Sequence, residues 1–136
     1  MFFKFVDRIY KDLPITLHNH GKIKHCFTFI DDVTECLIQT ALSNELNIDF
    51  SSRHPIFNFG GPHVLLEDCV EAIEIAMGKT AKREHVPLPK GDRWYTFADS
   101  SLAKKELNFN PKTPIKKGIS QFVDWYIKDY IPIINS

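Results

Sequence analysis

Three histidines near the start of the chain are the first residues whose type and spacing suggest chemistry. They are His18, His20 and His25, and imidazole is a common ligand of transition metals. No carboxylate or cysteine stands at a diagnostic interval from them, so the pattern argues against a metal site. His18 and His25 each also suit a turn or an edge strand that binds no ligand.

Two other pairs of residues allow a chemical and a structural interpretation. Asp31 and Asp32 resemble paired catalytic carboxylates, but they stand directly before an apolar helical stripe, where the helix dipole stabilises negative charge. We interpret them as helix-starting residues. The pair Gly60-Gly61 is followed by Pro62 and lacks a third glycine, which favours a plain turn over a phosphate cradle.

The residues needed for hydride transfer with a dinucleotide are missing from this sequence. A pyrophosphate needs a glycine-rich strand-to-helix turn that lets backbone N–H groups approach it, and the 136 residues contain none. None of the 4 tyrosines is followed four residues later by a lysine, so a tyrosine base with a lysine to lower its pKa is also missing. We therefore expect no catalytic residue and no cofactor in this chain alone.

The composition is that of an ordinary globular domain, with 43% hydrophobic and 25% charged residues. Lys+Arg 17 balance Asp+Glu 17, so no long-range field favours nucleic acid or anionic lipid as a partner. Cys26, Cys36 and Cys69 are widely scattered and are expected to stay reduced. Charged residues break the apolar N-terminus and no later run could span a bilayer, so we expect a cytoplasmic protein without a membrane partner.

The spacing of apolar residues predicts four substantial helices. They cover residues 2–11, 31–41 and 66–77, the third ending at Gly78, and a last helix that Thr113 and Pro114 start, with Pro114 at the first helical position. Asp99 should cap a further short helix that runs to Leu107. The helix over residues 31–41 should bury a single stripe, namely Val33, Cys36, Leu37, Thr40 and Ala41.

Short strands are predicted over residues 15–19, 24–30, 55–59 and 83–88, and a turn over 89–92. The polar stretch 43–54 carries few regular signals. Strands and helices do not alternate as a doubly wound sheet requires. We therefore predict a mixed α+β fold, with residues 1–136 forming a single small, helix-rich domain with short strands and no complete Rossmann fold.

Several blocks of the chain resemble the UDP-glucuronate 4-epimerases, which are extended short-chain dehydrogenase/reductases. Residues 14–33, PITLHNHGKIKHCFTFIDDV, closely resemble the stretch in which a strand and loop of those enzymes reach the uridine and diphosphate. Three further blocks agree in the same order: FNFG at 57–60, GD at 91–92 followed by ADS at 98–100, and PKTP at 111–114 running into the closing helix. The likeness extends from Phe2 to about Tyr130.

The resemblance implies the smaller C-terminal domain of such an enzyme, which binds the nucleotide-sugar. In the family, bound NAD removes a hydride from C4 of the sugar, the keto intermediate rotates, and the hydride returns to the opposite face. NAD, the tyrosine base and its lysine belong to the Rossmann half, which has no counterpart here. The resemblance therefore implies a truncated epimerase that supplies the UDP-sugar-binding lid and is catalytically inactive by itself.

Four positions are carried over as substrate-binding candidates. His18 stands where relatives place an aromatic side chain beside the uracil, and His25 where an arginine clamps the diphosphate. Arginine offers a permanent charge and a bidentate fork, whereas histidine is mostly neutral at pH 7, so UDP-sugar binding should be weak or lost. Asp92 matches the acceptor for the ribose hydroxyls, although a Gly-Asp pair is also common in plain turns. Lys90 can supply charge beside Pro89, where relatives carry a cation or an amide.

Two other functions stay open on the sequence. One is a non-catalytic module that binds sugar nucleotides or associates with itself, because the face that packs on the Rossmann half in relatives would be an exposed apolar patch that favours a homodimer. The other is one half of a split epimerase, completed by a separate Rossmann-domain chain.

Overall fold

The computed structural model describes residues 1–43 and 55–135, so most of the predicted polar stretch, residues 44–54, lies outside the described part. The chain divides into two compact units. Unit 1 comprises Met1–His25, Val64–Thr96 and Pro114–Ser136, and unit 2 comprises Cys26–His63 and Phe97–Thr113. The single domain expected over residues 1–136 stays a prediction.

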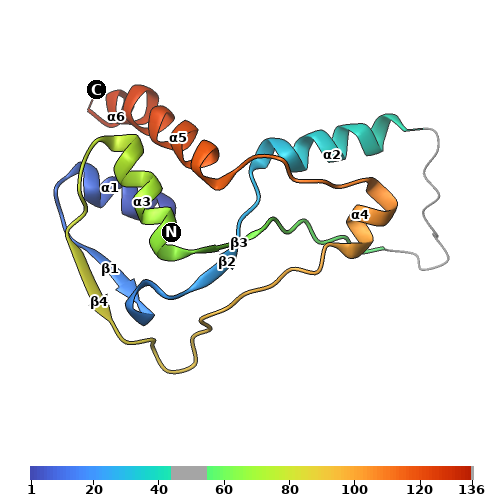
Figure 1. Ribbon diagram of the computed structural model, residues 1–136. Coiled ribbons are helices and arrows are strands. Elements are labelled where there is room, and N and C mark those ends of the chain that lie inside the picture. Colours follow the sequence, from blue (N-terminus) through green and yellow to red (C-terminus); the bar gives the residue numbers. More distant parts are fainter. Residues whose placement is uncertain (44–54, 136) are drawn as a thin grey trace. The chain divides into compact units, whose positions relative to one another are not determined.

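Unit 1 combines helices with a small parallel sheet (Figure 1). β1 (Ile15–His18) pairs with β4 (Arg83–Val86) in parallel, and Ile15 lies opposite Arg83. The helices of this unit are α1 (Phe2–Tyr10), α3 (Leu66–Met77), α5 (Ile115–Trp125) and α6 (Ile131–Ile134), with a 3-10 turn η1 (Asn19–Gly21) and a π-helical segment η2 (Tyr126–Tyr130). A second two-stranded sheet pairs β2 (Lys24–Cys26) with β3 (His63–Leu65).

Apolar stripes on the helices of unit 1 form its core. The stripe on α3 packs against α5, and Gly78 ends α3 in the left-handed conformation at φ 63°, as predicted. Full burial of each large apolar side chain contributes about 1.5–3 kcal/mol. The buried residues on these helices are Phe5, Val6 and Ile9 of α1, Leu66, Cys69, Val70, Ala72 and Ile73 of α3, and Ile119 and Val123 of α5.

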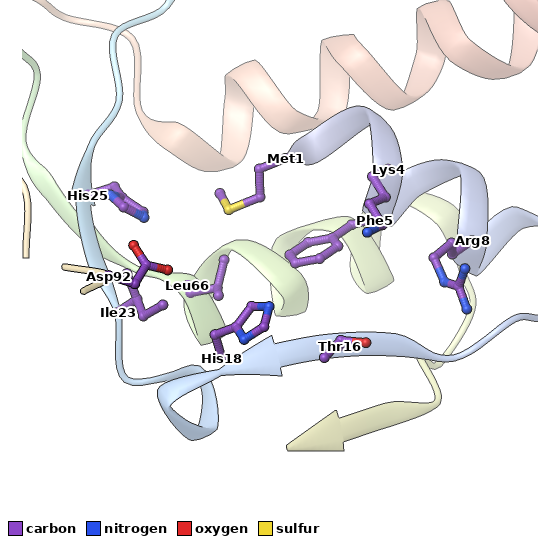
Figure 2. Close-up of a pocket in the computed structure, with 10 residues that line it drawn as sticks. All are labelled: Met1, Lys4, Phe5, Arg8, Thr16, His18, Ile23, His25, Leu66 and Asp92. Carbon is purple, nitrogen blue, oxygen red and sulfur yellow. The ribbon is translucent and has the colours of Figure 1, made fainter. Parts of the chain in front are cut away.

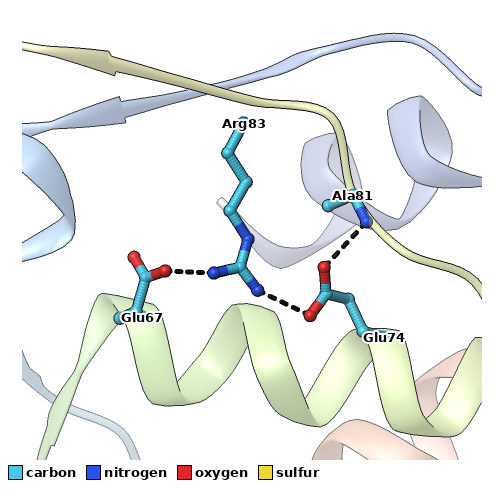
Figure 3. Close-up of polar contacts among 4 residues, drawn as sticks. All are labelled: Glu67, Glu74, Ala81 and Arg83. Carbon is cyan, nitrogen blue, oxygen red and sulfur yellow. Dashed lines mark hydrogen bonds and ion pairs between the residues drawn. The ribbon is translucent and has the colours of Figure 1, made fainter.

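An ion cluster ties β4 to α3 (Figure 3). The guanidinium of Arg83 binds the carboxylates of Glu67 and Glu74, the latter at 2.6 Å, and the second oxygen of Glu74 accepts the Ala81 N–H at 2.7 Å. Oε2 of Glu67 is buried without a hydrogen-bond partner among the described residues. A Cβ on Gly21, whose φ is +79°, would lie 2.2 Å from that oxygen. A side chain at this last residue of η1 would therefore displace the Glu67 carboxylate and would be strained at that φ.

A polar contact joins α1 to η2 at the edge of the same core. The buried Tyr126 donates its hydroxyl to Oδ1 of Asp7 at 2.7 Å, and Lys11 binds the same carboxylate at 2.7 Å. The hydrogen bonds from Lys11 and Tyr126 lower the pKa of Asp7 below its ordinary value, and burial together with the bond to Asp7 raises the pKa of Tyr126.

Tyr126→Phe is expected to lower the free energy of unfolding at pH 7 by about 0.5–1.5 kcal/mol, because the hydrogen bond to Asp7 is lost. Since folding lowers the pKa of Asp7, the ionised carboxylate stabilises the fold above its unfolded pKa of about 4, and that contribution is lost as the pH falls through the lower folded pKa. The variant should therefore lose less stability on acidification than the parent does.

The measurement is urea unfolding, followed by tryptophan fluorescence, at a series of pH values below 7. Tyr130→Phe is the matched control, because the described residues offer its hydroxyl no hydrogen-bond partner while its ring lies in the same aromatic cluster. Equal losses in the two variants would contradict the role given to the Asp7 contact.

Unit 2 has a small core between α2 (Ile30–Leu42) and α4 (Ser101–Leu107). Cys36 of α2 is buried, and its Sγ donates to the carbonyl oxygen of Leu107 at 3.5 Å. The buried members of this core are Cys36, Ala103, Leu107 and Phe109, with Phe57 and Phe59 packed against them.

Two predictions for unit 2 are wrong. The stripe of α2 is buried only in part, because Leu37 is 49% exposed and Ala41 is also exposed. The strand predicted over residues 55–59 does not form; those residues make no ladder, and strand β3 begins only at His63. Phe57 and Phe59 are two residues apart, and both contact the core of unit 2. This spacing is the period of a strand, although the segment has no partner strand.

Gly60 and Gly61 permit a close backbone approach and do not form the turn predicted for them. A Cβ on Gly61 would lie 2.0 Å from the carbonyl oxygen of Phe27, and one on Gly60 would lie 2.7 Å from Cβ of Ala98. The hydroxyl of the buried Ser100 accepts the Gly60 N–H at 2.7 Å. These glycines are needed for space, because neither has a positive φ.

The carboxylates expected at helix starts lie at those positions. Asp31 and Asp32 lie in the first turn of α2, and Asp32 accepts both the N–H and the hydroxyl of Thr113 at 3.0 Å. Asp99 accepts the N–H of Ser101 at 2.9 Å, although the N-cap position of α4 is the neighbouring Ser100. Pro114 is likewise the N-cap residue of α5 and not its first helical residue as predicted.

Candidate functional site

Unit 1 contains a pocket of about 260 Å³ (Figure 2). Its lining side chains come from α1 and Met1 before it, from β1, from β2 and Ile23 before it, from the start of α3 and from the turn after β4. Three of the four predicted substrate-binding residues line it together: His18, His25 and Asp92. The fold therefore brings side chains from distant parts of the sequence into one site.

The floor of the pocket is apolar. Phe5, Ile23 and Leu66 all line it and are almost fully buried, and Phe5 lies near its centre in Figure 2. An apolar floor with a few convergent polar groups is the usual lining of a small-molecule site. This arrangement can take a flat ring or the apolar face of a sugar.

His18 reaches the pocket because β1 alternates its side chains between two faces. Ile15 and Leu17 are fully buried, so Thr16 and His18 point to the opposite face, where both line the pocket. The exposed imidazole of His18 lies at the last residue of the strand, directly before η1.

His25 lies on β2, and hydrogen bonds join this strand to residues 94–96, which follow the turn that contains Asp92. Its Nδ1 lies 2.7 Å from the hydroxyl oxygen of Thr96, and this contact engages one of its two ring nitrogens. Backbone hydrogen bonds on either side, Lys24 N–H to Trp94 carbonyl at 2.8 Å and Thr96 N–H to Lys24 carbonyl at 3.1 Å, hold the two segments together.

Asp92 and Lys90 come from the predicted turn, but only one of them lines the pocket. The turn is closed by a hydrogen bond of 3.1 Å from the Asp92 N–H to the Pro89 carbonyl, with Gly91 at φ 85°. Asp92 points into the pocket and also accepts the Arg93 N–H at 2.8 Å. Lys90 is exposed on the turn itself and is not among the lining residues.

Two cationic side chains of the pocket were not predicted. Lys4 and Arg8 both line it from α1. The signal that could have found them is their spacing of four residues, which puts both on one face of a helix. That face could not be recognised as a pocket wall without knowing what α1 packs against.

Within residues 1–43 and 55–135, no group of three or more His, Cys, Asp or Glu side chains could hold a metal ion. His20 does not join His18 and His25, because its ring stacks on that of His85, with ring centroids 6.3 Å apart. No helix in the same part of the chain is both long and apolar enough to cross a bilayer.

Comparison with known proteins identifies relatives of this chain, although no protein-family model matches the sequence. The chain is 33% identical to the probable UDP-glucuronate 4-epimerase of Rhizobium meliloti, over 94% of this chain and 41% of that protein. It is 35% identical to the UDP-glucuronate 4-epimerase of Thermodesulfobacterium geofontis, over 98% of this chain and 39% of that protein. The chain thus spans about two fifths of the length of the curated relatives it matches.

Solved structures show the same fold. The crystal structure of UDP-glucuronic acid 4-epimerase from Bacillus cereus, in complex with UDP-glucuronic acid and NAD, matches with a TM-score of 0.78 at 23% identity, covering 93% of this chain and 39% of that one. UDP-glucose 4-epimerase from Thermotoga maritima, with UDP-glucose, matches with a TM-score of 0.76 at 19% identity, covering 95% and 40%. The predicted helix-rich fold with few short strands is confirmed. The chain is homologous to the C-terminal part of the UDP-glucuronate 4-epimerases, which are extended short-chain dehydrogenase/reductases.

Proposed function

We propose that this chain forms the nucleotide-sugar-binding portion of an NAD-dependent UDP-sugar epimerase, and that the pocket of unit 1 takes the nucleotide. The observation that carries the proposal is the convergence of His18, His25 and Asp92 on one pocket. Relatives over 94% or more of this chain are named UDP-glucuronate 4-epimerases, and a solved relative of the same fold contains UDP-glucuronic acid, which supports the same ligand class.

Each of these residues has a role that its chemistry allows. The exposed ring of His18 can stack on the uracil over the apolar floor of the pocket. Asp92 can accept hydrogen bonds from ribose hydroxyls. His25 offers little to a diphosphate, because its Nδ1 already contacts Thr96 and a histidine is mostly neutral at pH 7. Binding of the nucleotide should therefore be weak. Lys90 is exposed on the turn, so in this proposal it acts on the nucleotide only through electrostatic attraction over a longer distance.

NAD belongs, in this proposal, to a part of the enzyme outside this chain. A dinucleotide cradle needs glycines whose missing side chains leave room for a pyrophosphate. Beside Gly60 and Gly61 that room is filled by Ala98 and by the carbonyl of Phe27, so this pair does not fit the group. We assign no chemical step to this chain, and measurable epimerisation by the purified chain with NAD and UDP-glucuronate would overturn that assignment.

Titration of the purified chain by ligand-observed NMR tests the binding role. Uridine, UDP and UDP-glucuronate are all expected to bind weakly, and His25→Arg is expected to strengthen UDP binding by about twofold, because it adds a permanent positive charge to the pocket. Uridine does not carry the diphosphate, so its affinity should stay unchanged in the variant. If neither uridine nor UDP binds the parent chain at millimolar concentration, the pocket is not a nucleotide site.

A second candidate function is a module that associates with another protein. It is favoured by the exposed apolar side chains of α2, since Leu37, Ile38 and Leu42 are 49%, 59% and 77% exposed. A second copy of the chain or a separately encoded Rossmann-domain chain are the partners proposed, in the cytoplasm. Sedimentation that shows only a compact monomer at high concentration would count against the second copy.

A further inference from the structure

We infer that Lys4 and Arg8 form the anion-binding side of the pocket and hold the diphosphate of the nucleotide. This inference rests on the proposed function, because it names the residues that bind one part of the proposed ligand. It reassigns the role that the resemblance gives to position 25, where this chain has His25, to two cations on a different element.

The first step is position. Lys4 and Arg8 lie on successive turns of α1, and both line the pocket that His18, His25 and Asp92 also line. In Figure 2 the two cations lie along one side of the pocket, on α1, while His25 and Asp92 lie together at its other end. An elongated ligand that puts its ribose near Asp92 and its base over the apolar floor can therefore direct its phosphates toward α1.

The second step is charge. Apart from its histidines, the pocket lining has two positive side chains, Lys4 and Arg8, against one negative side chain, Asp92, which leaves an excess of one positive charge. The other carboxylate near this face of α1, Asp7, is already bound by Lys11 and by the Tyr126 hydroxyl. A pocket with this balance favours an anionic ligand.

The third step concerns competing ion pairs. Among the described residues, neither Lys4 nor Arg8 makes an ion pair. Arg8 donates its Nε to the carbonyl of Pro14, which orients the guanidinium and uses only one of its donors. A positioned guanidinium beside a lysine suits the oxygens of a phosphate, whereas the Nδ1 of His25 already contacts the Thr96 hydroxyl.

The test compares affinities for uridine, UMP and UDP in the full chain by NMR titration. Lys4→Gln and Arg8→Gln are each expected to weaken UDP binding by about three- to tenfold and to leave uridine binding within about twofold, because only the phosphates lose a charged partner. Lys116→Gln is the matched control, since this exposed lysine lies on α5 and not on the pocket, and it should change neither affinity. Added salt should reduce the advantage of UDP over uridine in the parent chain.

The outcomes separate the inference from the proposed function. If the parent binds uridine but UDP no more tightly, or if both glutamine variants bind UDP as the parent does, the inference fails while the nucleotide site stands. Equal weakening of uridine and UDP would also overturn it, because this would indicate a distorted pocket. Should the parent bind neither compound, both fail. Arg8→Lys, which keeps the charge, should retain more UDP affinity than Arg8→Gln if charge is what binds the phosphates.

Discussion

Gly61→Ala is expected to destabilise unit 2 by about 3 kcal/mol or more, enough to unfold a marginally stable unit. The added Cβ would lie 2.0 Å from the carbonyl oxygen of Phe27. This obstacle is backbone and cannot rotate away as a long side chain would, so the two segments must separate. Separation would pull Phe59 from the core of unit 2, because Thr28 donates its hydroxyl to the Phe59 carbonyl at 2.9 Å beside the same contact.

Hydrogen exchange measured on peptides of unit 2 provides the readout, since both tryptophans, Trp94 and Trp125, belong to unit 1. Amides of α4 should lose protection in the variant while those of α3 keep it. Gly78→Ala is the control: its Cβ would meet nothing within 4 Å, and only its φ of +63° is unfavourable, which should reduce stability by about 1–2 kcal/mol. Protection of α4 in Gly61→Ala equal to the parent would show that the two segments can part at little cost.

The second large effect is expected in unit 1. Ile73→Ala should lower the free energy of unfolding by about 2–5 kcal/mol, because the side chain is fully buried on α3 and its removal leaves a cavity that the packed helices fill only in part. α3 packs against α5 in this unit. Urea unfolding followed by tryptophan fluorescence measures the loss.

Ile75→Ala on the same helix is the matched control. Its side chain is 76% exposed, so the same truncation should change stability by no more than about 0.5 kcal/mol. A difference between the two variants of less than about 1 kcal/mol would contradict the burial assigned to Ile73 and to the face of α3 that it shares with Val70.

Much of unit 1 could be predicted from the sequence because its signals are local. A helical stripe on α3, with Gly78 directly after it, fixes both the buried face and the end of the helix. The same holds for α1, where the helical spacing of Phe5, Val6 and Ile9 puts them on one buried face. Alternation along β1 also placed a strand, which ends one residue earlier than predicted because Asn19 enters η1 with φ 49°.

Unit 2 was harder to predict because its residues respond to neighbours far along the chain. Phe57 and Phe59 have the period of a strand, yet their partners are the side chains of α4 and Phe109, which no local pattern can identify. Gly60-Gly61 has the composition of a turn, whereas its role depends on the approach of Phe27 and Ala98. Leu37 belongs to a predicted apolar stripe, but no described residue buries it.

Some residues of the candidate site could be predicted from the sequence and others could not. The resemblance to epimerases singled out His18, His25 and Asp92, and the fold brings all three to one pocket. Lys4 and Arg8 could not be singled out, because a pair of cations on a helix is usually a solvated face, and only the packing of α1 beside β1 makes it a pocket wall.

The two buried cysteines give this chain built-in reporters of local opening. Cys36 lies in unit 2 and Cys69 in unit 1, and both are free thiols. Burial, assisted by the charge of Asp68, raises the pKa of Cys69 to about 12, so its reactive thiolate is scarce while the unit stays closed. An alkylating reagent should therefore modify each thiol only when its own unit opens. The labelling rates of Cys36 and Cys69 then report the local opening of unit 2 and of unit 1 separately, in one unmutated sample.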